Sequence, residues 1–164
     1  MWAAWKGRTD TLKALLTSGA DVNAQDKSGA TALMFALSAR QAASAQALLA
    51  RTDININARR LDGSNALMLA IAAGNSEIVK ALLAKGADAN SSNSNGDTAL
   101  IFAVDKGNLE IVKALLDKGA DVHAQNKGKM TALLMAEQNG HTEIFQLLLS
   151  KGAGKKAGDE KTWP

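Results

Sequence analysis

Pairs of leucines return at a near-constant spacing along this chain of 164 residues. The pairs begin at Leu15, Leu48, Leu82, Leu115 and Leu148, so successive pairs are 33, 34, 33 and 33 residues apart. A period in this range is typical of stacked two-helix units, each of which buries its apolar face against its neighbours. The spacing therefore predicts a chain of repeated helical layers with no single central core. Such stacks usually present surfaces that bind other molecules.

Residues 63–90 show how one unit is expected to fold. Asn65 is an N-cap candidate for a helix that runs to about Ala73, because its short side chain can accept a hydrogen bond from a first-turn amide. Gly74 can adopt the positive φ that ends a helix. A second helix with an apolar face follows and ends at Gly86, and a short turn segment leads to the next unit. Two helices of this length are marginal alone and need neighbours to pack against.

Small side chains recur where neighbouring units must approach closely, because a bulky residue there would overpack the interface. These positions are Ala3, Ala36, Ala70, Ala103 and Ala136.

The second unit departs most from the common pattern. Arg40 stands where other units have the turn glycine, Thr52 replaces the later glycine, and one extra residue lies near Ile54. Its second helix, over residues 41–47, lacks large apolar side chains. We expect this unit to be the least well packed and the most irregular.

The last unit carries a carboxylate, Glu137, where earlier units have apolar residues. A charge is costly inside an apolar stack, and terminal repeats commonly have a polar outer face. We therefore expect Glu137 to lie in solvent as part of a C-terminal cap. Residues 155–164 form a polar tail, in which Trp163 either folds back over the last helices or stays free.

Composition narrows the chemistry that the chain can perform. There is no cysteine and there are two histidines, His123 and His141, which occupy structural positions of the repeat. The spacing gives no catalytic triad, no zinc motif and no phosphate-binding loop. No apolar run approaches the roughly 18 residues of a membrane span. All five arginines lie in the first 60 residues, where eight Lys/Arg face four Asp/Glu; this favours an acidic partner or is ordinary solvated surface.

Several motifs resemble the ankyrin repeat family. Residues 96–104 read Gly-Asp-Thr-Ala-Leu-Ile-Phe-Ala-Val, residues 107–116 read Gly-Asn-Leu-Glu-Ile-Val-Lys-Ala-Leu-Leu, and residues 19–24 read Gly-Ala-Asp-Val-Asn-Ala. The usual proline of the family is alanine in every readable copy, a variant that is similar to bacterial members. The resemblance implies an all-α ankyrin repeat solenoid of about five repeats over 1–154, the first of them truncated. The implied repeats are 1–25, 26–59, 60–92, 93–125 and 126–154, followed by the tail 155–164.

In ankyrin-like proteins, the turn tips and the exposed flanks of the first helices form the binding surface. Carried over by position, the resemblance marks Trp5, Lys6, Lys27, Arg59, Leu61, Asp62, Asp97, Asp105, Lys106, Met130 and Gln138 as partner-binding residues. Ser28, Ala30 and Ser38 lie on the same implied surface. Tryptophan and arginine dominate many protein interfaces, so Trp5 and Arg59 are expected hot spots.

The resulting hypothesis is a non-enzymatic module that binds another protein on its concave face. The narrower alternative is an inhibitor or immunity-type protein that caps a dedicated bacterial enzyme. We expect no cofactor, metal, nucleic acid or membrane partner, and a monomer. The printed start aligns with the middle of a helix in other copies, so a cytoplasmic or a periplasmic location for this soluble chain stays open.

Overall fold

The computed structural model describes residues 1–154, and this part of the chain contains ten α-helices and no strand. The first helix of each layer is one of α1 (Trp2–Trp5), α3 (Ala32–Ser38), α5 (Ala66–Ala73), α7 (Ala99–Asp105) and α9 (Ala132–Gln138). The second helix is one of α2 (Thr9–Thr17), α4 (Ala42–Leu49), α6 (Ser76–Ala84), α8 (Leu109–Asp117) and α10 (Thr142–Ser150). The predicted all-α fold class is confirmed.

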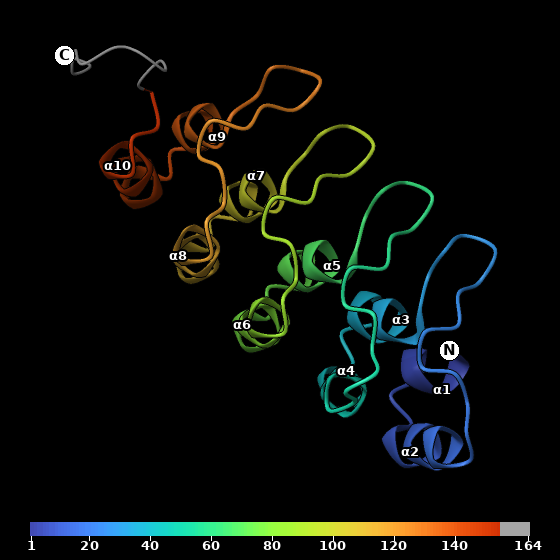
Figure 1. Ribbon diagram of the computed structural model, residues 1–164. Helices are drawn as coiled ribbons and strands as arrows, with labels where there is room; N and C mark the ends of the chain where they lie inside the picture. Colours follow the sequence, from blue (N-terminus) through green and yellow to red (C-terminus); the bar gives the residue numbers. More distant parts are fainter. Residues whose placement is uncertain (155–164) are drawn as a thin grey trace. The chain divides into compact units, whose positions relative to one another are not determined.

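The helices fall into two compact units, one over Met1–Asp88 and the other starting at Ala89. In the first unit, α3 packs between α1 and α5, and α4 contacts α2 and α6 (Figure 1). In the second unit, α7 packs against α9, and α8 contacts α10. Hairpin-like loops join the layers, and each is closed by one isolated antiparallel bridge. These bridges are Gln25 to Thr31, Arg59 to Asn65, Ser92 to Thr98 and Gln125 to Thr131.

The predicted capping residues hold the helix ends. Asn65 precedes α5 and accepts a hydrogen bond from the Met68 amide at 3.0 Å, which satisfies a first-turn donor. Thr31 and Thr98 cap α3 and α7 in the same way. Gly74 ends α5 with φ 71°, a left-handed conformation that side chains rarely adopt. These local signals set where the helices begin and end.

Each unit has an apolar core between its helix layers. On α4, α6, α8 and α10, the first leucine of each pair is 0% exposed. These residues are Leu48, Leu82, Leu115 and Leu148. The alanines expected at close helix approaches are also buried: Ala3, Ala36, Ala70, Ala103 and Ala136. Burial of these side chains is the main term that stabilises helices too short to persist alone.

A ladder of asparagine side chains ties successive turns together. Asn57 donates from its amide to the Gly86 carbonyl at 3.1 Å and accepts from the Asp88 amide at 3.0 Å. Asn23 makes the equivalent pair with the following turn in the first unit, and Asn90 does so in the second. Each amide satisfies two backbone groups at once, so this position needs a side chain with both a donor and an acceptor.

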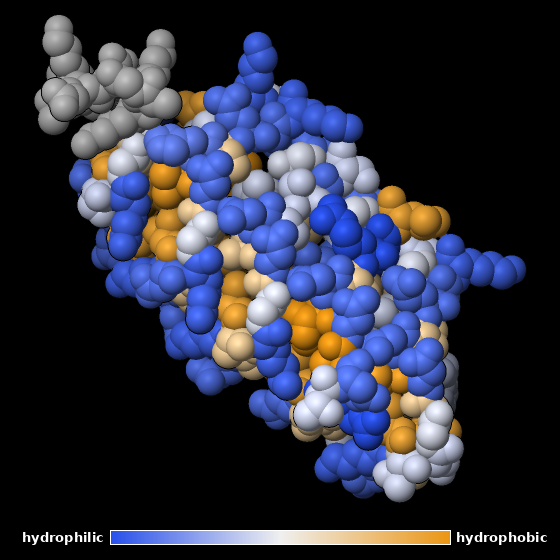
Figure 2. All heavy atoms as spheres, viewed as in Figure 1, coloured by the Kyte–Doolittle hydropathy of each residue, from blue (hydrophilic) through white to orange (hydrophobic). Residues whose placement is uncertain are grey.

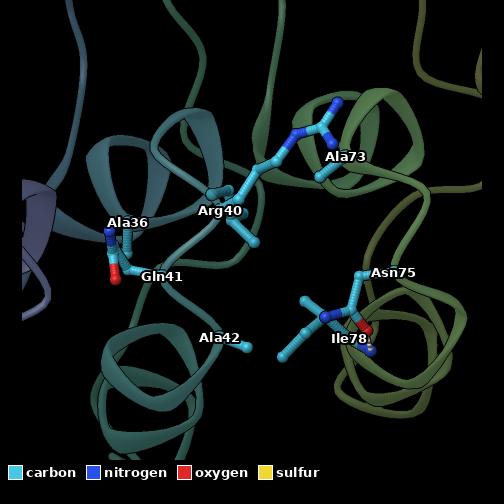
Figure 3. A pocket seen from close by; sticks show the side chains of 8 residues that line it. Ala36, Arg40, Gln41, Ala42, Ala73, Asn75 and Ile78 are labelled. Atoms are coloured by element: carbon cyan, nitrogen blue, oxygen red, sulfur yellow. Dashed lines mark hydrogen bonds between the residues drawn. The ribbon is translucent and has the colours of Figure 1, made fainter.

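The second layer contains the expected irregularities. Arg40 adopts φ 54° where a glycine is expected, and α4 is 8 residues long whereas α6 has 9. The Ser44 side chain replaces an apolar residue, is buried, and lies 3.1 Å from the Thr9 hydroxyl, so the small polar group keeps a partner. A cavity of about 40 Å³ lies beside Ala42 (Figure 3). That this layer is the least well packed one stays a prediction.

The last described layer agrees with the expected cap. Glu137 is exposed on α9, and the neighbouring Leu134 is 43% exposed. The carboxylate therefore avoids the cost of burial. The prediction for Trp163 and the tail falls outside the described residues.

Candidate functional site

Hydrogen bonds within the hairpins decide which of their side chains are left for other contacts. Asp26 holds the first hairpin: one of its carboxylate oxygens accepts from the Ser28 amide at 2.9 Å, the Ser28 hydroxyl at 2.7 Å and the Ala30 amide at 2.8 Å. In the second unit, Asn93 and Asn126 hold their hairpins through side-chain oxygens in the same register. An acceptor at this position therefore has a structural role.

The hairpin before α5 breaks this rule. Arg60, which has no side-chain acceptor, occupies the register position of Asp26. Asp62 takes over the structural role, because its carboxylate accepts from the Ser64 amide at 2.9 Å and from the Ser64 hydroxyl at 2.5 Å. The Ser64 hydroxyl bond, the Ser64 amide bond and the nearby Arg60 charge together hold the pKa of Asp62 below its usual value.

Neighbouring hairpins in the first unit approach at backbone distance. The Leu61 amide donates to the Ser28 carbonyl at 2.9 Å. A Cβ added at Gly29 would lie 2.8 Å from the Arg59 carbonyl oxygen, so only glycine fits there without a shift. The second unit repeats the contact, with the Lys127 amide donating to the Asn95 carbonyl at 2.9 Å. The tips thus form fixed platforms for the side chains that they carry.

A pocket of about 370 Å³ opens between these hairpins and the helices α1 and α3 of the first unit. We call it the Trp5–Arg60 pocket. Its lining residues are Trp5, Asp26, Ser28, Ala30, Met34, Phe35, Ser38 and Arg60. Aromatic and thioether side chains supply apolar wall, and Asp26 and Arg60 supply charge. A mostly apolar concave site with a few polar groups is the usual form of a binding site.

Two tryptophans on α1 are exposed, but only one lines this pocket. Trp5 is 45% exposed, and the Lys6 ammonium lies 4.3 Å from the centre of its ring. Trp2 is 57% exposed, and the Arg8 guanidinium lies 4.9 Å from its ring centre. Both pairs have cation–π geometry. On the face drawn in Figure 2, hydrophilic side chains predominate and apolar ones gather in patches between them.

The sequence-predicted residues of the first unit are on its surface. Lys27 and Arg59 are exposed, and Leu61 is 81% exposed at a hairpin tip, which is unusual for so large an apolar side chain. Asp62 is exposed as well, but its carboxylate is engaged by Ser64. Of the residues predicted to bind a partner, Trp5 lines the Trp5–Arg60 pocket.

Three of the predicted residues of the second unit, Asp97, Asp105 and Lys106, are engaged in side-chain contacts. Asp97 accepts from the Asn126 side-chain amide at 2.6 Å and from that of Asn93 at 3.2 Å. Asp105 pairs with Lys106 at 3.0 Å. Met130 is half-buried on its hairpin, and Gln138 is exposed at the end of α9. The structure gives Asp97 a structural role that its position in the repeat did not reveal.

Asp26, Met34, Phe35 and Arg60 line the pocket but were not predicted as site residues. Met34 and Phe35 lie in an apolar run of α3, which by itself does not distinguish a core residue from a pocket wall. Arg60 had a usable signal: its register position holds an acceptor in the hairpins of Asp26, Asn93 and Asn126. A cation at such a position departs from the structural pattern and therefore indicates another role.

The two histidines lie at positions fixed by the repeat. In the described part of the chain, no group of three or more His, Cys, Asp or Glu could hold a metal ion. His141 lies against Gly107, where an added Cβ would be 2.7 Å from the imidazole, so its ring closely packs the turn before α8. His123 is exposed and replaces the asparagine of the turn ladder. Both positions agree with structural roles.

Comparison with known families identifies the class. The family model described as ankyrin repeats (3 copies) matches residues 1–93 and again 67–159. The chain therefore belongs to the ankyrin repeat family, and its fold is the all-α helical repeat solenoid of that family. A search of curated proteins found no match. Ankyrin repeats are generally protein–protein interaction modules, and the family is typically non-enzymatic. No helix within residues 1–154 is long and apolar enough to cross a membrane.

Proposed function

We propose that this chain is a protein-binding module, that it has no catalytic activity of its own, and that the first unit carries the main contact surface. The observation that carries the proposal is the Trp5–Arg60 pocket beside the exposed tips of the hairpins. Tryptophan and arginine often dominate protein interfaces. The exposed Leu61 adds apolar surface at a hairpin tip. Fixed hairpins also limit the conformational entropy lost on binding.

The surface that we assign to the partner combines the pocket with the exposed residues around it. Lys6 lies over the Trp5 ring, and Lys27 and Arg59 are exposed on the two hairpins that meet at Ser28 and Leu61. Such charges speed encounter with an acidic partner and help to select it. Asp62 contributes less, because its carboxylate already serves the hairpin. Met130 and Gln138 form a secondary candidate surface on the second unit.

Affinity capture from the native host, followed by titration of the captured protein, tests the proposal. Alanine at Trp5, Arg59 and Leu61 together should weaken binding by at least about tenfold, the loss expected from removing hot-spot side chains. The matched control is alanine at Lys13, Asp10 and Leu15, which are exposed on α2 away from the hairpins. Unchanged affinity for the first variant would remove this site.

An inhibitor of a dedicated bacterial enzyme is a narrower form of the same proposal. The discriminating measurement is the activity of a captured enzyme with and without an equimolar amount of this chain. Loss of activity at equimolar ratio would assign the inhibitor role, and full activity in a stable complex would assign the scaffold role. The proposal also treats the chain as a monomer that binds neither nucleic acid nor membrane; light scattering checks the oligomeric state.

A further inference from the structure

We infer that the Trp5–Arg60 pocket binds a carboxylate side chain, glutamate or aspartate, that a partner protein presents beside an apolar residue. The inference deepens the proposed function and rests on it. It assigns Arg60 the role of charge-selecting residue, and the apolar walls the role of seating the neighbouring side chain.

The first step is that the Arg60 side chain does not hold its own hairpin. The Nε atom of Arg60 is buried and has no hydrogen-bond partner among residues 1–154. The hairpin is held by Asp62, which accepts both donors of Ser64. A guanidinium carries five N–H donors, and burying one without a partner is costly. The position is therefore explained better by a ligand than by hairpin stability.

The second step concerns the shape and chemistry of the walls. Phe35 and Met34 project from α3, and Trp5 comes from the end of α1, so apolar surface faces the hairpin that carries Arg60. A guanidinium beside apolar walls bonds a carboxylate more strongly than in open water, because the local dielectric is lower. Its planar fork also matches the two oxygens of a carboxylate. Glutamate or aspartate next to an apolar residue fits both features.

The third step is charge complementarity around the pocket mouth. Lys6 lies over the Trp5 ring, and Lys27 and Arg59 are exposed on the adjoining hairpins. The first 60 residues contain eight Lys/Arg and four Asp/Glu. An acidic segment is therefore attracted to this unit, whereas a basic one is repelled.

Asp26 is the residue on the pocket wall that opposes this inference. Its Oδ1 atom already accepts three hydrogen bonds, from the Ser28 amide, the Ser28 hydroxyl and the Ala30 amide. The Ser28 hydroxyl bond is the largest cause of the lowered pKa of Asp26, and the Arg60 charge adds to it. The carboxylate stays ionised but its Oδ1 is committed to its own hairpin, so Asp26 reduces the positive charge at the pocket without occupying the Arg60 donors.

The experiment is a nitrogen-15 NMR titration with three capped tetrapeptides: acetyl-Gly-Leu-Glu-Gly-amide, its Gln analogue and its Lys analogue. The Trp5 indole N–H and the Arg60 Nε–H are reporters inside the site, and the Trp2 indole N–H reports on non-specific contact outside it. We expect the Glu peptide to move both site reporters and to bind about tenfold more tightly than the Gln peptide, as for a hydrogen bond to a charged group. The Lys peptide should move neither.

Two variants locate the effect. Arg60→Gln should reduce the affinity for the Glu peptide to that of the Gln peptide. Arg51→Gln removes the same charge at an exposed position that pairs with Asp53, outside the pocket, and should change the affinity by less than about twofold. If Arg60→Gln does not fold, the comparison of the three peptides on the natural chain still decides the matter.

Equal shifts, or no shifts, with the Glu and Gln peptides would overturn the inference, and so would equal losses in the Arg60 and Arg51 variants. The proposed function is tested separately, by the triple alanine variant and a captured protein. The triple alanine variant could lose the captured partner while the Glu and Gln peptides give equal shifts or none. That result would support the protein-binding module and reject the carboxylate pocket.

Discussion

The two units use similar residues differently at their hairpins. In the first unit, Trp5 and Leu61 are exposed and the Arg60 Nε lacks a partner beside a pocket. In the second unit, Asp97 bonds the side chains of two asparagines, and Asp105 pairs with Lys106. The repeat pattern makes equivalent positions look equally available. Because hydrogen bonds and an ion pair already engage the second-unit residues, the first unit is the better candidate for binding a partner.

The units also differ in the chemistry that holds their tips. Carboxylates do this in the first unit, at Asp26 and Asp62, and amides do it in the second, at Asn93 and Asn126. Both groups accept hydrogen bonds from backbone amides, but only the carboxylate titrates. The same local geometry therefore has different sensitivity to acid.

The largest expected effect separates two exposed tryptophans of the first unit. Trp5→Ala should weaken binding of a captured partner by about 2 kcal/mol, roughly thirtyfold, because it removes an aromatic wall of the pocket. Trp2→Ala is the matched control, since Trp2 is also exposed on α1 and does not line the pocket. Isothermal titration calorimetry gives both values. Equal losses would mean that α1 as a whole, and not the pocket, contacts the partner.

A second prediction places Asp97 in the structure of the second unit. Asp97→Ala should lower the free energy of unfolding by about 1–2 kcal/mol, because it removes the acceptor of the Asn126 amide. Asp105→Ala should cost less than about 0.5 kcal/mol, since its pair with Lys106 is exposed. Urea denaturation measures both. A loss of partner affinity in Asp97→Ala without a loss of stability would return Asp97 to the binding surface.

Acid should weaken the tip hydrogen bonds that the carboxylates of Asp26 and Asp62 accept in the first unit. The Ser28 and Ser64 hydroxyl bonds hold the pKa values of Asp26 and Asp62 below the usual 3.8. Because the pKa of each carboxylate is lower in the folded state, its ionised form stabilises the fold above pH 3.8. This contribution to the free energy of unfolding is lost as the pH falls from 3.8 through the folded pKa. The amide proton signals of Ser28 and Ser64 should therefore shift in this range, while that of Ile78, which donates to the neutral Asn75 side chain, stays constant.

Asp26→Asn is the control for the acid effect, since asparagine holds the equivalent hairpins of the second unit. It should abolish the shift at Ser28 and leave the shift at Ser64. If all three amide signals move together, acid unfolding of the whole chain and not local titration is the cause.

The smallest expected effect is one that the units share. Arg40 in the first unit has φ 54° and Lys129 in the second has φ 61°, and each occupies a register position at which other layers have glycine. Arg40→Gly and Lys129→Gly should each stabilise the fold by no more than about 1 kcal/mol, because glycine avoids the left-handed strain but loses more entropy. Thermal unfolding checks the values. A clear destabilisation by Arg40→Gly would show that its side chain contributes packing.

Much of the fold could be predicted because its signals are local. The cap at Asn65, the helix end at Gly74 and the buried leucine pairs each depend on short-range hydrogen bonding or on helical periodicity. The asparagine ladder was harder to predict, because the partners of Asn57 lie about 30 residues further along the chain. The regular recurrence of asparagine at this position is visible in the sequence, whereas the hydrogen bonds that it makes are not.

The candidate site was only partly predictable for the same reason. Trp5, Ser28, Ala30 and Ser38 were placed on the implied surface, and all four line the pocket. Phe35 was not predicted, although it is half-buried and lies on the pocket wall. Helical periodicity tells which face of a helix is apolar, but it does not tell where the neighbouring hairpin leaves that face uncovered.

The sequence by itself determined the layered helical fold, its caps and its turn glycines, because these follow from periodicity and backbone conformation within a few residues. Only the tertiary structure decided which hairpin side chains are engaged and which are available. Asp97 and Arg60 both look like free surface charges in the sequence. Asp97 accepts a hydrogen bond from Asn126, which is 29 residues away and which only the stacking of layers brings close. The Arg60 side chain lines a pocket whose other walls come from α1 and α3, and that placement too depends on the stack.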